Sequence, residues 1–317
     1  MAAERLYARI LYPPDSHQMY GLLTADLAKA SYTCPMDDNA IQTHCFQPEP
    51  PSLHLVRWMG HQVFGVLAEE QLLGFIDVGV GFDHATQHLM DDRPLGLLRF
   101  LALPQDYALS GQVARLLLQT AETYWREQSV RRVRAFSLST GYPTYQLGVG
   151  ILPSTWEDHH RWLNRADYRP VERFYCLAYP LQRLVREEVP AGVYTLYPQF
   201  DEIGLRYQLY EGDEMRIAAT RMIERRVHGT PTVREGISEP QNDNPVAGLV
   251  ELIVASGWRN RGIGRWLLRR MINDAYLRGN CSLVGFVGHT NEAGLGLCRK
   301  VGFEEMAYRG YTLEKKL

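Results

Sequence analysis

The chain has little cysteine, and its cysteines form no recognisable pattern. Its 317 residues include five, none in a CxxC motif or at zinc-ligand spacing from a histidine, at positions 34, 45, 176, 281 and 298. An odd and scattered set describes neither a disulfide framework nor a zinc site. We therefore expect free thiols, a cytoplasmic protein and no bound metal.

Long apolar runs and an excess of either charge are also lacking. No run is long enough to cross a bilayer, and the first five residues (MAAER) do not begin a signal peptide. A net charge of −2 argues against a nucleic-acid binder that relies on a broadly basic surface. We expect a protein that engages neither membranes nor nucleic acids.

The chain does contain one order of elements that occurs twice. Its length exceeds the ~100–200 residues usual for one domain, which favours two. In the first half, apolar spacing predicts helices over residues 16–29, 39–47, 111–128 and 156–164 and strands over 62–69, 72–79, 95–103, 133–138 and 173–179. The second half predicts strands over 193–198, 205–210, 215–222, 249–255, 282–287 and 309–314 and helices over 262–277 and 291–300.

The two halves also align in segments. Arg115 matches Arg265 at an offset of 150 residues, and Trp162 matches Leu297 at an offset of 135. Two copies of one mixed α/β domain explain this order, although two unrelated α/β halves can agree by chance. A charged run over residues 182–190 indicates a solvated linker between domains 1–181 and 191–317, and the polar residues 230–245 indicate an exposed loop.

The segment Arg259-Asn260-Arg261-Gly262-Ile263-Gly264 is the strongest candidate for a binding site. It follows a predicted strand and opens a predicted helix. Glycines at a helix mouth leave backbone N–H groups bare at the positive end of the helix, where they can hold a phosphate or pyrophosphate. The alternative is an ordinary glycine-rich turn between a strand and a helix.

Two motifs in the second half resemble those of the GCN5-related N-acetyltransferase (GNAT) family. The family pattern Arg/Gln-x-x-Gly-x-Gly/Ala after a strand is matched by Arg259, Gly262 and Gly264. A second family pattern, Asn-x-x-Ala-x-x-Leu-Tyr-x-x-x-Gly-Phe, is matched over residues 291–303 (NEAGLGLCRKVGF), with Gly294 at the alanine position and Cys298 at the tyrosine position. Over the first half the resemblance extends only to the order of elements.

The resemblance implies a fold and a co-substrate. It implies an α/β (α+β) protein of two tandem GNAT-like domains, each with a mixed, mostly antiparallel central sheet flanked by helices, and it implies acetyl-CoA as acyl donor. The pyrophosphate would lie on the loop and helix start, and the pantetheine arm would pair with the end of the preceding strand. The residues so assigned are Ile253, Val254, Ala255, Arg259, Asn260, Arg261, Gly262, Ile263, Gly264, Arg265, Asn291 and Cys298.

Three residues are candidates for proton transfer. Glu251 lies in an apolar run of the strand, where desolvation would raise the pKa of its carboxyl group and suit it as the base that deprotonates the amine; the alternative is an outward-facing glutamate. In the family, the tyrosine of the second motif protonates the CoA thiolate. Cys298 stands there, either as the acid or as a small core residue, with Tyr308 and Tyr311 as alternative donors.

The two copies depart from the family in different ways. In the first, Leu109, Gln112 and Ala114 stand where the second has Arg259, Gly262 and Gly264, so we expect this copy not to bind CoA. The second lacks room for the two helices that in the family follow the first strand and wall the acceptor site.

The predicted function is transfer of an acyl group, acetyl by preference, from CoA to the amine of a small molecule. The resemblance implies a direct reaction in a ternary complex, by a monomer or homodimer. The alternatives are a non-catalytic CoA-binding or regulatory protein and a structural module with a vestigial loop.

Overall fold

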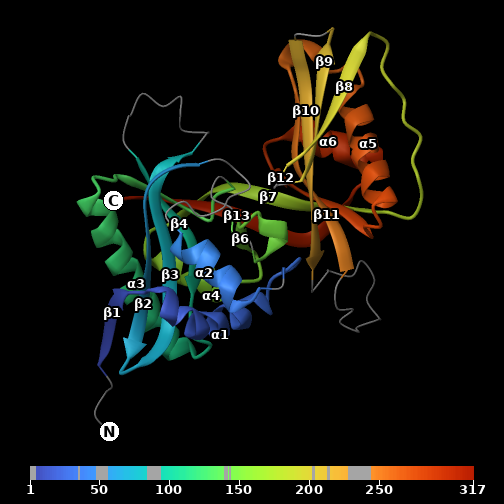
Figure 1. The fold of residues 1–317 in the computed structure, drawn as a ribbon. Helices are drawn as coiled ribbons and strands as arrows, with labels where there is room; N and C mark the ends of the chain where they lie inside the picture. Colours follow the sequence, from blue (N-terminus) through green and yellow to red (C-terminus); the bar gives the residue numbers. More distant parts are fainter. Residues whose placement is uncertain are drawn as a thin grey trace. The chain divides into compact units, whose positions relative to one another are not determined.

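From the second strand onward, the two halves of the chain have the same order of main elements: three strands, a helix, a strand, a helix and a strand (Figure 1). The structure, a computed structural model, describes residues 5–34, 36–47, 56–83, 94–138, 142, 144–201, 204–212, 215–227 and 244–317. They form two units: unit 1 contains Met1–Arg173 and Gly310–Leu317, and unit 2 contains Phe174–Arg309. Each unit has a mixed, mostly antiparallel sheet flanked by helices, which confirms the predicted fold class.

Unit 1 contains a six-stranded path of sheet. Its elements are β1 (Leu6–Ile10), α1 (Ser16–Leu27), α2 (Asp38–Phe46), β2 (Val56–Ala68), β3 (Gln71–Asp83), β4 (Leu95–Ala102), α3 (Tyr107–Glu127), β5 (Arg132–Ala135), β6 (Leu152–Pro153), α4 (Glu157–Arg165) and the first part of β7 (Arg169–Pro180). The order is β1-β2-β3-β4-β5-β13, and only the β4–β5 pair is parallel.

Unit 2 is built on the same plan without the first pair of helices. Its elements are β8 (Tyr194–Phe200), β9 (Leu205–Glu211), β10 (Met215–Val227), β11 (Asn244–Val254), α5 (Ile263–Leu277), β12 (Ser282–Gly288), α6 (Glu292–Val301) and the first part of β13 (Glu304–Lys316). The order is β8-β9-β10-β11-β12-β7, with β11–β12 the parallel pair. Only four residues separate β8 from β9, where unit 1 has α1 and α2.

The last strand of each half completes the sheet of the other unit. Phe174–Pro180 of β7 pair with β12, and Gly310–Lys316 of β13 pair with β5 and β6. The division therefore differs from the expected domains 1–181 and 191–317. A charged linker marks an exposed segment, but it does not say which sheet a flanking strand joins, because any apolar strand can supply the missing ladder of hydrogen bonds.

The segment expected to be a solvated linker is fixed to α5. Most of its side chains are exposed, but the Asn273 Oδ1 atom accepts from the Val185 amide at 2.7 Å and its Nδ2 atom donates to the Val185 carbonyl at 2.9 Å. Glu187 and Glu188 lie within 3.6 Å and 3.2 Å of Arg270 and Arg269. A solvated composition therefore does not mean a segment without contacts.

Most predicted elements are present, with shifted ends. Helix α3 begins at Tyr107 instead of residue 111 because Asp106 caps it, accepting from the Leu109 amide at 3.0 Å. Strand β1 was not predicted, and β13 begins five residues earlier than expected. Of the expected loop 230–245, residues 230–243 lie outside the described residues, and the last two begin β11.

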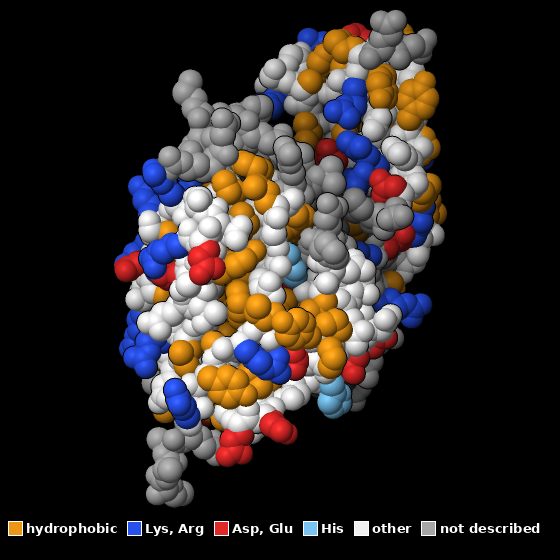
Figure 2. All heavy atoms as spheres, turned by 60° about the vertical axis from the view of Figure 1, so that its left-hand side comes forward, with side chains coloured by type: hydrophobic (Ala, Val, Ile, Leu, Met, Phe, Trp, Pro, Cys, Tyr) orange, Lys and Arg blue, Asp and Glu red, His pale blue; other side chains and the backbone are white. Residues whose placement is uncertain are grey.

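Charge is mixed on the face shown in Figure 2. Basic and acidic side chains are interspersed there, as a net charge of −2 leads one to expect. Among the described helices, none is long and apolar enough to cross a membrane.

The two faces of the sheet in unit 1 are covered differently. A Cβ atom at Gly74 would lie 2.6 Å from Val113 of α3, so this face packs closely on α3. Asp77, three residues further along β3, faces the other way and carries a buried polar cluster. Its carboxylate binds Arg99 at 2.9 Å and His61 at 2.8 Å, and the Arg99 guanidinium lies over the rings of Trp58 and Tyr142.

Removing one member of this cluster leaves an uncompensated buried charge. We expect Asp77→Ala to lower the free energy of unfolding by about 3–5 kcal/mol, because the Arg99 cation loses its carboxylate partner. Urea titration followed by tryptophan fluorescence measures this. Asp158→Ala is the control, since its pair with Arg161 is exposed and a loss below about 1 kcal/mol is expected. Equal losses for the two variants would contradict the argument.

Candidate functional site

Strands β11 and β12 pair at one end only. Their parallel register covers Val246–Leu249 and Ser282–Gly285, although β11 continues to Val254 and β12 to Gly288. At the same level β11 has a bulge. Arg221 and Met222 of β10 are consecutive, but the residues that they face, Glu251 and Leu249, are two apart, so β11 has one extra residue there. The two strands therefore separate over the stretch that the resemblance assigns to the pantetheine arm.

The loop after β11 turns through two left-handed residues before α5 begins. Asn260 has φ 63° and Gly262, the N-cap of α5, has φ 85°. No side chain caps the helix. In the described part of the chain, the amide N–H groups of residues 260–265 have no hydrogen-bond acceptor. A row of bare amides at the start of a fifteen-residue helix is suited to bind a phosphate group.

The six arginines between residues 259 and 278 divide into two groups. Arg269, Arg270 and Arg278 lie within 3.6 Å of the carboxylates of Glu188, Glu187 and Glu224. Near the loop, Arg259 donates to the Val254 carbonyl at 3.1 Å, Arg261 lies over the Trp258 ring, and Arg265 is exposed. Among the described residues none of these three has an acidic partner, so positive charge remains beside the bare amides.

The end of β11 offers fewer backbone groups than expected. The Ala255 amide donates to Ile217 at 2.8 Å, and the Ala255 carbonyl accepts from Trp258 at 2.8 Å. Both backbone groups of Ala255 thus have partners within the chain, and its pairing with pantetheine stays a prediction. Ile253 is 58% exposed, and the Val254 carbonyl holds only the side chain of Arg259, which can move.

Glu251 does not have the apolar surroundings expected of it. Its side chain is 25% exposed, and its carboxylate lies 3.7 Å from the guanidinium of Arg206 on β9. This contact follows from the register, because Arg221 pairs with Glu251 on one side and with Arg206 on the other. Sequence reasoning missed Arg206, although the alternation of β9 places it on the face opposite the core.

Cys298 is a buried thiol in the core of unit 2. It lies on α6, among the apolar side chains that pack between α5 and the sheet. Burial raises its pKa to about 11. A thiol whose pKa is raised above the ordinary cysteine value of about 8.5 is a weaker proton donor. The structure thus favours the core role for Cys298.

The two tyrosines named as alternative donors belong to different units. Tyr308 lies in the unit 2 part of β13, is buried, and contacts the edge of the Phe286 ring at 6.4 Å between centroids. Phe286 is the first residue of β12 beyond its pairing with β11. Tyr311 lies in the unit 1 part and contacts His160. Of the two, only Tyr308 shares a unit with the separated strands.

Asn291 caps α6. Its side-chain oxygen accepts from the Gly294 amide at 2.9 Å, and a Cβ atom at residue 294 would lie 2.8 Å from its Nδ2 atom. Glycine at the family's alanine position therefore allows this cap to fit. Within the described residues, no three His, Cys, Asp or Glu side chains gather in a way that suits a metal ion.

The corresponding region of unit 1 is closed. Helix α3 is six residues longer than α5 at its start, so the residues that match the loop of unit 2 are helical, and the Asp106 carboxylate occupies the helix N-terminus. Strand β5 ends at Ala135, where its pairing with β4 also ends, while β4 continues to Ala102, and aromatic rings lie beyond this point. Among them, Trp156 packs against Phe100 and Phe136.

A family model supports this interpretation. The model of the acetyltransferase (GNAT) family matches residues 142–303, just over half of the chain. The chain belongs to the GNAT family. Members of this family use acetyl-CoA as co-substrate, and the match runs through the loop at Arg259–Gly264 and the second motif. A search of curated proteins found no match to the sequence.

Solved structures with the same fold include a tandem GNAT protein. A GNAT from Sphaerobacter thermophilus is 14% identical, with a TM-score of 0.59 over 100% of this chain and 97% of that one. A tandem GNAT protein from the clavulanic acid biosynthesis pathway is 12% identical, with a TM-score of 0.64 over 98% of each chain. A GCN5-related glucosamine N-acetyltransferase region of a fungal GH3 β-N-acetylglucosaminidase is 14% identical, with a TM-score of 0.69 over 99% of this chain and 38% of that one.

The left-handed turn before α5 gives a testable difference between two glycines. We expect Gly262→Ala to destabilise unit 2 by about 1–2 kcal/mol, because a side chain raises the energy of a positive φ. Gly257→Ala is the control, since Gly257 has open space and no positive φ, and a change within about 0.5 kcal/mol is expected. The nearest atom to a Cβ at residue 262 is 3.6 Å away, so crowding does not explain a difference. Thermal unfolding of the two variants measures it.

Proposed function

We propose that unit 2 transfers an acetyl group from acetyl-CoA to the amine of a small molecule by direct attack in a ternary complex. The observation that carries this proposal is the start of α5, where bare amides and arginines without acidic partners lie beside two separating strands. A pyrophosphate matches the amides, and an extended amide-bearing arm matches the free strand edge.

The loop residues have separate tasks in this proposal. The amides of residues 261–265 would hold the pyrophosphate, with Arg261 and Arg265 neutralising its charge. Val254 would pair with the pantetheine arm once the Arg259 side chain releases its carbonyl, and Ile253, whose backbone pairs with Ala219 of β10, would contact the arm through its exposed side chain. Asn291 would contribute the Nδ2 group of its side chain, since its oxygen is used by the helix cap.

The acceptor would approach from the face of the sheet that carries Glu251. Tyr207 faces α5, where the Arg270 guanidinium lies over its ring, so Arg206 and Glu251 face the opposite side. Ile253 shares that side and is 58% exposed. The helices α5 and α6 lie together on the other side of this sheet (Figure 1). A small amine therefore has access to a carboxylate next to the strand end.

Proton transfer is assigned to Glu251 and Tyr308. The Glu251 carboxylate, 3.7 Å from Arg206, can attract an ammonium group and accept its proton directly or through a water molecule. Tyr308 is the remaining candidate for protonating the leaving thiolate, because the buried Cys298 is too weak an acid. A thiolate leaves more readily than an alkoxide, so this step needs little help.

Unit 1 is proposed as a copy that does not bind CoA. The Asp106 carboxylate at the start of α3 would repel a phosphate, and the aromatic rings beyond β4 and β5 leave no room for a pantetheine arm. The cytoplasmic location and the choice between monomer and homodimer stay predictions. All five cysteines are free, which fits a reducing compartment.

CoA binding is tested by charge reversal at the two ends of α5. Acetyl-CoA should raise the melting temperature of the wild type, and Arg265→Glu should weaken its binding by about tenfold or more. An acid in the first turn stabilises a helix, so loss of binding would not reflect unfolding. Arg278→Glu makes the same change of charge at the other end and should bind acetyl-CoA normally. No stabilisation of the wild type by acetyl-CoA would refute the proposal.

Catalysis is tested by release of the CoA thiol over a panel of small amines that includes glucosamine. Glu251→Gln should lower kcat/KM by about a hundredfold or more, because the base is lost while the shape is kept. Tyr308→Phe should lower kcat by less, and Cys298→Ala should retain wild-type kcat/KM. The alternative is a non-catalytic, CoA-binding regulatory protein, and it is supported by the absence of the tyrosine from the second motif. Binding of acetyl-CoA without turnover of any amine would favour this alternative.

A further inference from the structure

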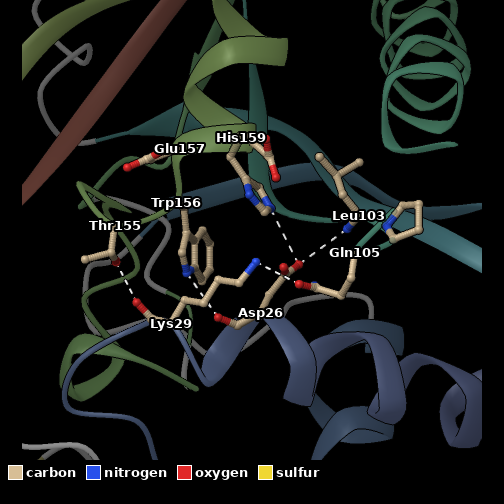
Figure 3. Close-up of a pocket in the computed structure, with 10 residues that line it drawn as sticks. Asp26, Lys29, Leu103, Gln105, Thr155, Trp156, Glu157 and His159 are labelled. Carbon is tan, nitrogen blue, oxygen red and sulfur yellow. Dashed lines mark hydrogen bonds and ion pairs between the residues drawn. The ribbon is translucent and has the colours of Figure 1, made fainter. Parts of the chain in front are cut away.

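Unit 1 has a cavity of about 240 Å³ at the edge of the aromatic cluster that closes its copy of the CoA crevice, with Trp156 in its lining (Figure 3). It opens between the end of α1, the segment after β4 and the start of α4. The residues that carry the argument are Asp26, Lys29, Leu103, Gln105, Trp156 and His159. At the offsets that align the two halves, Leu103 corresponds to Ile253, Trp156 to Asn291 and His159 to Gly294. The cavity is thus flanked by the counterparts of residues assigned to CoA in unit 2.

A buried carboxylate lines this cavity. Asp26 is only 2% exposed. Its Oδ2 atom has two long contacts, 3.4 Å from the Leu103 amide and 3.5 Å from His159 Nε2, and among the described residues no donor reaches Oδ1. His159 Nε2 instead donates to the Leu101 carbonyl at 2.7 Å. A buried carboxylate normally accepts several hydrogen bonds, so Asp26 has capacity for a further donor.

The rest of the lining favours a cation. The Trp156 indole fixes Asp26 by donating to its carbonyl at 3.1 Å, and its ring lies 4.8 Å from that of His159, so an aromatic surface stands beside the carboxylate. Glu157 adds a second negative charge, while Asp158 is paired with Arg161. The lining also includes Lys29, which is exposed and whose Nζ atom donates to the Gln105 Oε1 atom at 2.7 Å. An ammonium group beside an aromatic ring and a desolvated carboxylate is favourable on both counts.

We propose that this cavity binds a small primary ammonium ion, with its N–H groups directed to Asp26. Unit 1 would then hold an amine beside the counterparts of Ile253 and Asn291, which in unit 2 are assigned to CoA. The glycine-lined anion site is replaced by Asp106 at the helix start and by Asp26 in the crevice. The site is separate from the acetyl-transfer site and does not depend on CoA binding.

The test uses the full chain and follows the Trp156 indole N–H by NMR, assigned with Trp156→Phe. Ethanolamine is the probe, and ethylene glycol, in which a hydroxyl replaces the amine, is the matched neutral control. We expect a saturable shift of the Trp156 signal with ethanolamine and none with ethylene glycol. Asp26→Asn should weaken ethanolamine binding by about tenfold or more. No shift, or equal shifts with both probes, would overturn the proposal.

Two further variants keep the result interpretable. Gln105 is exposed at the rim, so Gln105→Trp should fold and should block ethanolamine even if Asp26→Asn does not fold. Arg265→Glu should lose acetyl-CoA binding and bind ethanolamine normally, which separates this site from the proposed function. If Glu251→Gln abolishes the Trp156 shift, or if Gln105→Trp binds as well as the wild type, the amine lies elsewhere and the proposal is wrong.

Discussion

The parting of β11 and β12 is the constraint on which the site of unit 2 depends. Adjacent parallel strands normally exchange hydrogen bonds along their whole length, and a strand edge without a partner must find one in a ligand or in water. Here the register ends at Leu249 and Gly285, and the bulge opposite Arg221 turns the rest of β11 away. The loop with Gly262 then begins α5 at the end of this free edge. Backbone groups of the unpaired strand edge and bare amides of the helix start therefore lie in the same region.

The two units show how one fold plan permits opposite electrostatics. Each has one pair of parallel strands, connected through a helix that follows the first of them. In unit 2 the helix begins with bare amides and nearby arginines. In unit 1 the helix is extended by six residues and capped by Asp106, aromatic rings occupy the gap, and Asp26 lines the crevice that remains. The two helix starts thus differ in charge: Asp106 lies at the start of α3, while Arg261 and Arg265 lie at the start of α5.

Local signals in the sequence located the glycine loop before α5 but not its surroundings. Gly262 and Gly264 mark the turn because few residues tolerate a positive φ or a close approach, and this information is local. The contact between Glu251 and Arg206 depends on the register of three strands and on a bulge, so it could not be derived from the apolar run around Glu251. For the same reason the sequence did not predict that Asn273, far from the linker along the chain, forms a hydrogen bond with Val185.

The sequence by itself determined the fold class, the order of elements in both halves and the family, because periodicity and glycine motifs are encoded within short segments. Only the tertiary structure decided that β7 and β13 each complete the sheet of the other unit, that Cys298 is a core thiol, and that Asp26 and His159 line one cavity. These facts depend on contacts between residues that are far apart in the chain. Hydrogen bonding and burial are satisfied by the whole sheet and core, and no single segment carries that information.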